Sequence, residues 1–306
     1  MSRGSAAAIA MAAVVILAGT ALSGTVPSKY IDDPDIDEWD ASQITGYRAW
    51  MRDVTARNPF VDKVMLEPDG GSASRVSAPG TDARLGELDL AGFFGNALAF
   101  SQGANLGNGN WDIRIIDLDS GTDEVLPAGI NTQKGENHAN LSGNHLLFHR
   151  GPNGSEFGRR VILFDLLTAT PIELAQAPTG GSVSADDVTG DYATYTACPP
   201  TGRCDVYRYQ ISSAETLQMP DGGKATYYSS VRADGTVYFV RGSPRYCGVH
   251  TQIRRYDGTS TSLYQFPNDI EIGPINAVDD GGGGTTVLFT RIRCQPFRTG
   301  IWQIPG

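Results

Sequence analysis

The sequence lacks the short motifs that mark common catalytic and phosphate-binding sites. It contains no G-x-S-x-G nucleophile motif, no P-loop and no H-E-x-x-H zinc motif. Histidine is limited to 4 residues, so side chains that titrate near neutral pH are few. The formal net charge of −10 makes nucleic acid an unfavourable partner. Linear motifs therefore assign no activity, although a site assembled from single residues of several repeats would leave no motif.

The N-terminal segment is typical of a secretory signal peptide. Residues 1–23 carry one arginine, an apolar stretch over residues 6–22 and small residues before Gly24. An uncleaved membrane anchor is the alternative, but the stretch is shorter than the roughly 20 residues of a spanning helix. We expect a secreted or extracytoplasmic protein, associated with the cell envelope and without stable membrane insertion once the leader is removed. The mature chain is then residues 24–306.

A short pattern repeats six times along the mature chain. Its copies begin at glycines separated by 49, 48, 47, 45 and 49 residues, and an aromatic residue follows each glycine by four or five positions. The glycines are Gly46, Gly95, Gly143, Gly190, Gly235 and Gly284, and the aromatic residues are Trp50, Phe100, Phe148, Tyr195, Phe239 and Phe289. Strand-like units with this period predict an all-β fold, a six-bladed β-propeller in one domain.

The repeat also predicts the blades and their strands. The expected blades cover residues 34–77, 82–127, 137–175, 181–219, 225–267 and 272–306. Each begins with an innermost strand, continues through the aromatic strand, and reaches a third strand of alternating character. A fourth strand follows in five units, including residues 122–129 of the second, whereas the sixth unit ends without one. Residues 25–31 are extended in character, so we expect strand exchange between the N- and C-terminal segments to close the ring.

Four cysteines in a chain with a leader predict two disulfides. Cys198 and Cys204 flank the turn between the second and third strands of the fourth repeat, which favours a bond between them. Cys247 and Cys294 lie in the corresponding loops of the neighbouring fifth and sixth repeats, which predicts a bond between blades. The paired short spacings of a zinc site are missing.

Three segments carry a resemblance to a known family. They are RADGTVYFV at residues 232–240, LSGNHLLFHRG at 141–151 with RVILFDL at 160–166, and DIRIIDLDSG at 112–121. Over residues 34–306 the chain resembles the six-bladed, TolB-like and WD40-like β-propeller of TolB and its secreted actinobacterial relatives. The resemblance implies the architecture but no particular activity. It does not extend to the domain that precedes the propeller in TolB.

Candidate ligand contacts gather where the aromatic strands end, beside the long loops that lead to the third strands. Four arginines at equivalent positions could receive carboxylates of a sugar acid or peptide: Arg52, Arg150, Arg241 and Arg291. Ion pairs with aspartates of other blades, such as Asp117, Asp165 and Asp257, are the alternative. His138, His149 and His250 are expected near the same face, as ligand contacts or as packed histidines.

The acidic run over residues 33–40 spaces its carboxylates like a calcium loop, but Glu38 and Ile44 stand where such a loop needs glycine and glutamate. We therefore interpret it as a solvated segment leading into the first blade. The sequence predicts no metal site.

The favoured function is an exported, non-enzymatic binding module, monomeric and without a cofactor, that holds a protein, peptide or cell-wall glycan on its long-loop face. The alternative is a propeller hydrolase or lyase with a cation such as calcium in the central channel. Three or more Asp, Asn, Glu or His side chains converging on one point of the channel would favour that alternative.

Overall fold

The computed structural model of the protein describes residues 27–31, 36–53, 62–103, 110–152, 158–220, 222–242, 251–267, 269–280, 282–295 and 297–306. The predicted signal peptide and most of the long loops between second and third strands lie outside these ranges. Among the described residues, no helix is long and apolar enough to cross a membrane.

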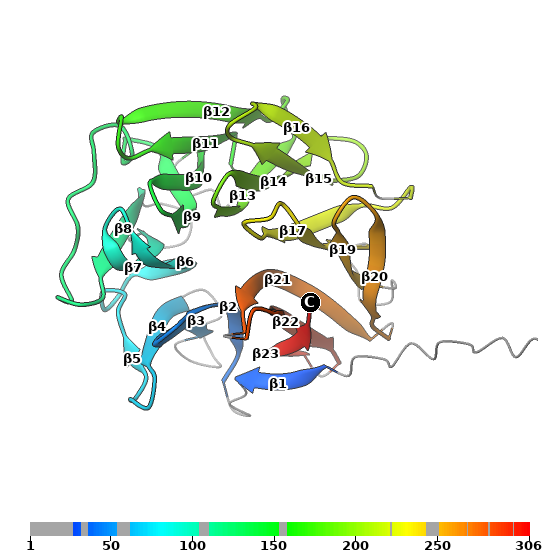
Figure 1. Ribbon diagram of the computed structural model, residues 1–306, viewed down its shortest axis with the longest axis horizontal. Helices are drawn as coiled ribbons and strands as arrows, with labels where there is room; N and C mark the ends of the chain where they lie inside the picture. The colour runs from blue at the N-terminus through cyan, green and yellow to red at the C-terminus, as the bar shows by residue number, and fades with distance from the viewer. Residues whose placement is uncertain are drawn as a thin grey trace, which may run out of the picture.

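Six antiparallel sheets surround a common centre, which confirms the six-bladed β-propeller (Figure 1). Each sheet places its first strand nearest the centre and the later ones successively outwards. The first sheet contains β2 (Glu38–Ile44), β3 (Tyr47–Asp53), β4 (Asp62–Pro68) and β5 (Ser74–Arg75). The second contains β6 (Asp82–Gly92), β7 (Gly95–Gly103) and β8 (Trp111–Asp117). The third contains β9 (Gly135–Ser142), β10 (His145–Gly151), β11 (Arg160–Asp165) and β12 (Thr170–Gln176).

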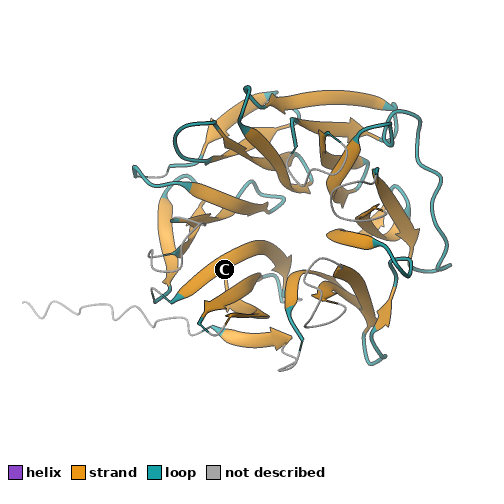
Figure 2. Ribbon diagram, turned by 180° about the vertical axis from the view of Figure 1, so that it is seen from behind, coloured by secondary structure: helices purple, strands orange, loops and turns teal. Residues whose placement is uncertain are grey.

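The remaining three sheets complete the ring, which Figure 2 shows from behind. The fourth contains β13 (Ser182–Thr189), β14 (Tyr192–Cys198), β15 (Asp205–Gln210) and β16 (Glu215–Gln218). The fifth contains β17 (Thr226–Val231), β18 (Val237–Arg241), β19 (Gln252–Tyr256) and β20 (Ser260–Gln265). The sixth contains β21 (Ile270–Asp279), β22 (Thr285–Cys294) and β23 (Phe297–Pro305), and the N-terminal strand β1 (Ser28–Ile31) pairs antiparallel with β23 on its outer side.

The repeated aromatic residues pack between the blades. Each lies on the second strand of its sheet and is at most 6% exposed. Trp50, for example, packs with Leu288 and Ile301 of the sixth sheet, and Phe148 packs with Ile113 and Ile115 of the second. One such apolar cluster fills each of the six junctions, and the aromatic residue always meets the preceding blade. The core is therefore a ring of contacts between blades, which explains the period of the sequence.

The repeated glycines form the turns between first and second strands. Five of the six have a positive φ, between 58° and 92°, a conformation that residues with a Cβ rarely adopt. In the last blade Gly283, with φ of 82°, takes this role in place of Gly284.

The second blade has three strands, so the fourth strand expected over residues 122–129 is wrong. Only an isolated bridge joins Ile116 to Asp123 there. Beyond it, the side-chain amide of Asn131 takes the place of a strand: it accepts a hydrogen bond from the Ile113 N–H at 2.8 Å and donates one to the Ile113 carbonyl at 2.9 Å. Pro127 in this segment cannot donate a ladder hydrogen bond, which disfavours a regular strand.

Candidate functional site

The candidate site arises from an irregularity that all six innermost strands share. Each departs from regular pairing with its second strand near its middle, as a β-bulge does, and β6 has a second irregularity between Asp89 and Gly92. The residue at this point is partly exposed, whereas the next residue or the one after it is buried. We call these six residues, one from each blade, the channel ring: Asp40, Glu87, His138, Asp186, Tyr228 and Pro274.

Three members of the channel ring adopt a positive φ without being glycine. The values are 42° for Asp40, 54° for His138 and 42° for Tyr228. Such a conformation costs of the order of 1–3 kcal/mol, and residues that adopt it within strands are enriched at functional sites. The bulges direct polar side chains toward the axis, while the adjacent residues still pack between the blades.

A small cavity lies at the level of the channel ring. All six innermost strands contribute to its lining, and its volume is about 40 Å³. The lining contains Asp40, Asp186 and Asp187, the aromatic residues His138 and Tyr228, and the amide residues Asn140 and Asn276, and none of the described residues in it is lysine or arginine. The site is therefore rich in hydrogen-bond acceptors and negative charge.

Burial makes these carboxyl groups hard to ionise. Loss of water contacts raises the pKa of Asp40 and of Asp186 to about 7. A backbone hydrogen bond to Asp40 and two hydroxyl groups that donate to Asp186 oppose this rise. The hydroxyls of Thr196 and Ser229 each donate to Oδ2 of Asp186 at 2.6 Å. Burial also raises the pKa of Tyr228 to about 12, and neighbouring carboxylates add to that shift. Near neutral pH the ring can exist in several protonation states.

Glu87 and Asp187 form a buried carboxyl pair that connects the second and fourth blades. Burial raises the pKa of Glu87 well above its usual range, and the charge of Asp187 raises it further. Burial also raises the pKa of Asp187, but hydrogen bonds from Glu87, Ser230 and the Val231 N–H oppose that rise. Burial and the neighbouring charge of Asp187 thus both favour the protonated form of Glu87, whose O–H would donate to Asp187.

Polar contacts continue from the channel into the junctions between blades. At each junction a backbone N–H of an innermost strand or of the turn that follows it donates to a side chain of the preceding blade. For example, Val231 N–H donates to Asp187 Oδ2 at 2.8 Å and Ala277 N–H donates to Ser230 Oγ at 2.9 Å. The innermost strands are therefore held in register with one another, which fixes the channel ring as a rigid unit.

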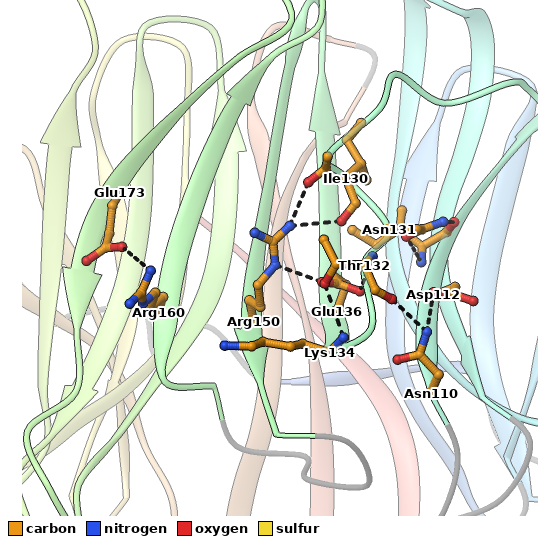
Figure 3. A network of polar contacts seen from close by, with 12 residues as sticks. Asn110, Asp112, Ile130, Asn131, Thr132, Lys134, Glu136, Arg150, Arg160 and Glu173 are labelled. Atoms are coloured by element: carbon orange, nitrogen blue, oxygen red, sulfur yellow. Dashed lines mark hydrogen bonds and ion pairs between the residues drawn. The ribbon is translucent and has the colours of Figure 1, made fainter.

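Two of the four predicted arginines hold buried glutamates of their own blades. Arg52 Nη2 lies 2.6 Å from Glu38 Oε1, and Arg150 Nε lies 2.7 Å from Glu136 Oε1. Arg150 also donates to the carbonyl of Ile130 at 2.9 Å (Figure 3). These glutamates are the first residue of β2 and the second residue of β9, and they are at most 1% exposed.

The other two arginines make different contacts. Arg241 donates to Gln252 Oε1 at 3.1 Å, and the guanidinium of Arg291 lies 4.4 Å from the ring centre of Trp302. The aspartates proposed as partners in other blades have local roles. Asp257 pairs with Arg255, while Asp117 and Asp165 accept hydrogen bonds from the amides of their own turns.

The structure brings together two of the three predicted histidines. The rings of His138 and His149 lie 4.8 Å apart, His138 in the channel ring and His149 buried at 1% exposed. The Ala185 N–H is directed at His149 Nδ1 across the junction between the third and fourth blades, at 3.4 Å. His250 lies outside the described residues.

The acidic run before the first blade is not wholly solvated, so that interpretation is wrong for its last residues. Glu38 is 1% exposed, forms an ion pair with Arg52 and accepts a hydrogen bond from the indole N–H of Trp50. Asp40 belongs to the channel ring. Both lie within β2, where every residue is buried or partly buried.

One predicted disulfide is confirmed, between Cys198 and Cys204 at the ends of β14 and β15. Cys294 is also disulfide-bonded, but its predicted partner Cys247 lies outside the described residues, so that pairing stays a prediction. Across the described ranges, no three His, Cys, Asp or Glu side chains are arranged to hold a metal ion.

Comparison with solved structures places the fold among known propellers. Putative TolB from Agrobacterium tumefaciens superposes with a TM-score of 0.55 at 12% identity, over 89% of this chain and 90% of that one. The β-propeller domain of the Trilobed protease from Pyrococcus furiosus gives 0.52 at 13%, over 88% and 95%. TolB from Acinetobacter baumannii gives 0.51 at 15%, over 80% of this chain but only 60% of that one. No protein-family model and no curated protein matches the sequence. At these identities the likeness establishes the propeller fold alone, shared with TolB-like proteins and with propeller domains of peptidases.

Proposed function

We propose that the protein is an exported, non-enzymatic binding module, and that its ligand enters the central channel from the face where the aromatic strands end. The observation that carries the proposal is the channel ring: six innermost strands depart from regular pairing at the same level, and five of the six residues presented there are polar or aromatic. A structural ring needs no such side chains, whereas a binding site does.

A protein or peptide is the favoured ligand, and a cell-wall glycan is the alternative. Two similar folds come from peptidases, the β-propeller domain of the Trilobed protease and prolyl oligopeptidase B from Galerina marginata bound to a 35mer substrate, the latter with a TM-score of 0.50 over 38% of that chain. An extended peptide can reach a narrow channel with one side chain while the rest lies on the face. Arg241 and Arg291 at that face, with Arg52, Arg150 and the histidines beside them, are proposed as further contacts.

The disulfide supports an oxidising compartment, since such bonds are rare in the cytosol. The proposal also includes a signal peptide over residues 1–23 and a single domain over residues 24–306. It includes as well a monomeric state, the absence of a cofactor and kinship with the secreted actinobacterial relatives of TolB. Closure of the ring by strand exchange belongs to it as well, supported by the pairing of β1 with β23.

The test is binding of purified mature protein to two immobilised ligand sets, a library of random peptides and soluble cell-wall glycan fragments. We expect retention on peptides, weakened by Tyr228→Ala and unchanged by Tyr256→Ala, which alters a partly buried tyrosine of the fifth sheet away from the cavity lining. Retention on glycans alone would show that the ligand is a glycan and not a peptide. Equal binding by the two variants would show that the channel is not part of the binding site.

One observation favours the alternative, a hydrolase or lyase. A protonated Glu87 beside Asp187 is the kind of carboxyl pair that can supply a general acid and a base. Turnover of chromogenic glycosides or peptides that is abolished by Glu87→Gln, at unchanged melting temperature, would establish that function instead.

A further inference from the structure

We propose that the channel cavity is a site for a primary ammonium group, carried by a lysine side chain or by an amino sugar. The inference rests on the proposed function, because it names the chemical group that the ligand would insert between Asp40 and Asp186. It differs from the predicted arginine site, which would have received carboxylates.

The size of the cavity limits the occupant. A water-sized group needs roughly 10–15 Å³, so a space of about 40 Å³ accepts a small head group. The channel-ring residues are nevertheless partly exposed, so an alkyl chain entering from the face can bring its terminal group here.

The lining contains a buried acceptor that lacks a donor. Asp187 is 4% exposed and lines the cavity, but its carboxyl group is already held by Ser230, the Val231 N–H and Glu87. The side-chain oxygen of Asn276, also in the lining, is buried and has no hydrogen-bond donor among the described residues. Buried acceptors without donors are costly. An ammonium group carries three donors and no acceptor, which matches this lining.

The negative charge and the aromatic rings of the cavity lining also favour an ammonium group. Asp40 and Asp186 face the cavity from the first and fourth blades, and the other titratable groups around it, among the described residues, are His138, Tyr228, Asp187 and Glu87. The charge of Glu271 raises the pKa of Tyr228, and the charge of Arg84 lowers the pKa of Asp40. Arg84 itself is paired with Asp62 and Asp82. Aromatic faces stabilise ammonium ions, whereas calcium requires six to eight oxygen ligands.

The experiment is a titration of the mature protein with small probes, followed by NMR or calorimetry at pH 8. The first probe is butylammonium, with butyramide as the neutral control. N-acetyl-lysine amide and glucosamine then distinguish a lysine from an amino sugar, and calcium chloride tests a metal. We expect butylammonium to bind and butyramide not to bind.

Asp186→Asn should weaken butylammonium binding about tenfold or more, since it removes charge while keeping an acceptor for Thr196 and Ser229. Asp257→Asn is the matched control, because it removes an equal charge from the exposed edge of the fifth sheet. Lowering the pH to 5 should weaken binding to the unmodified protein, which tests the site even if the variant folds poorly.

Three outcomes would overturn the inference: equal binding of butyramide, no binding of butylammonium at millimolar concentration, or binding of calcium that butylammonium does not displace. Peptide binding that survives Asp186→Asn would support the proposed function but contradict the ammonium site. Butylammonium binding without retention of any peptide or glycan would support the ammonium site but contradict the proposed function.

Discussion

At the scale of single residues, the protein separates two kinds of buried carboxylate. Glu38 and Glu136 lie at the start of innermost strands and are neutralised by arginines near the ends of the adjacent strands, so they anchor the blades. Asp40, Glu87, Asp186 and Asp187 lie at the channel and have no arginine ion pair among the described residues. The first kind serves stability, and the second is the candidate for function.

Arg150→Gln should lower the free energy of unfolding by about 1–3 kcal/mol, because it leaves the fully buried Glu136 carboxylate without its counter-charge. Urea denaturation measures the effect. Arg160→Gln on the same blade is the control, since its pair with Glu173 is exposed on both sides and should change stability by less than about 0.5 kcal/mol (Figure 3). Equal losses in the two variants would show that the buried pair has no special role.

At the scale of strands and turns, each blade departs from the ideal at particular places. The second blade replaces its fourth strand by the Asn131 amide, and the sixth takes β1 as its outermost strand. The disulfide closes the turn between β14 and β15 in the fourth blade.

Replacing both Cys198 and Cys204 by serine should cost about 2 kcal/mol, as the bond closes a short loop with a sequence separation of 6. Thermal melts of the variant and of the parent protein, with and without reductant, measure this. The variant should still contain the bond between Cys247 and Cys294 in a non-reducing peptide map. Four free thiols in the exported parent protein would contradict both bonds.

At the scale of the whole molecule, stability depends on six junctions that must close together. Strand β1 contributes to the last junction, because Tyr30 and Ile31 pack on the cluster that contains Trp50, Leu288 and Ile301. An incomplete sixth sheet would expose the edge of β23 to solvent and to other chains.

Deleting residues 25–31 should therefore lower the melting temperature by about 2–4 °C, the shift expected from roughly 1–2 kcal/mol in a domain of this size. Replacing the same residues by glycine and serine keeps the chain length but removes the packing of Tyr30 and Ile31, so it separates packing from backbone pairing. An unchanged melting temperature after deletion would refute closure by this strand.

The molecule should also lose stability as the pH rises. Folding raises the pKa of Asp40 and Asp186 to about 7 and that of Asp89 to about 6, so the folded state binds more protons than the unfolded chain. Their contribution is complete below about pH 4 and is lost as the pH rises through 6 to 7. Exposed carboxyls with lowered pKa, such as Asp165 and Asp191, act only at lower pH.

Melting temperatures at pH 5.5 and 8.5 test this dependence. We expect the lower value at pH 8.5, and a smaller difference in Asp186→Asn, which cannot ionise. A higher melting temperature at pH 8.5 would contradict the burial of these groups as neutral acids.

The sequence by itself determined the ring of six blades, because each repeated glycine must form a turn and each repeated aromatic residue must be buried against a neighbour. It also placed the bond between Cys198 and Cys204, since both lie at one turn. The tertiary structure alone decided the channel ring. Asp40, Glu87, His138 and Asp186 lie at unequal distances before their glycines, because the strands differ in length and irregularity, so no repeat aligns them. The adjacent Asp186 and Asp187 inside a strand were a local signal. Their pKa and partners depend on blades that are distant in sequence, which no local pattern can specify.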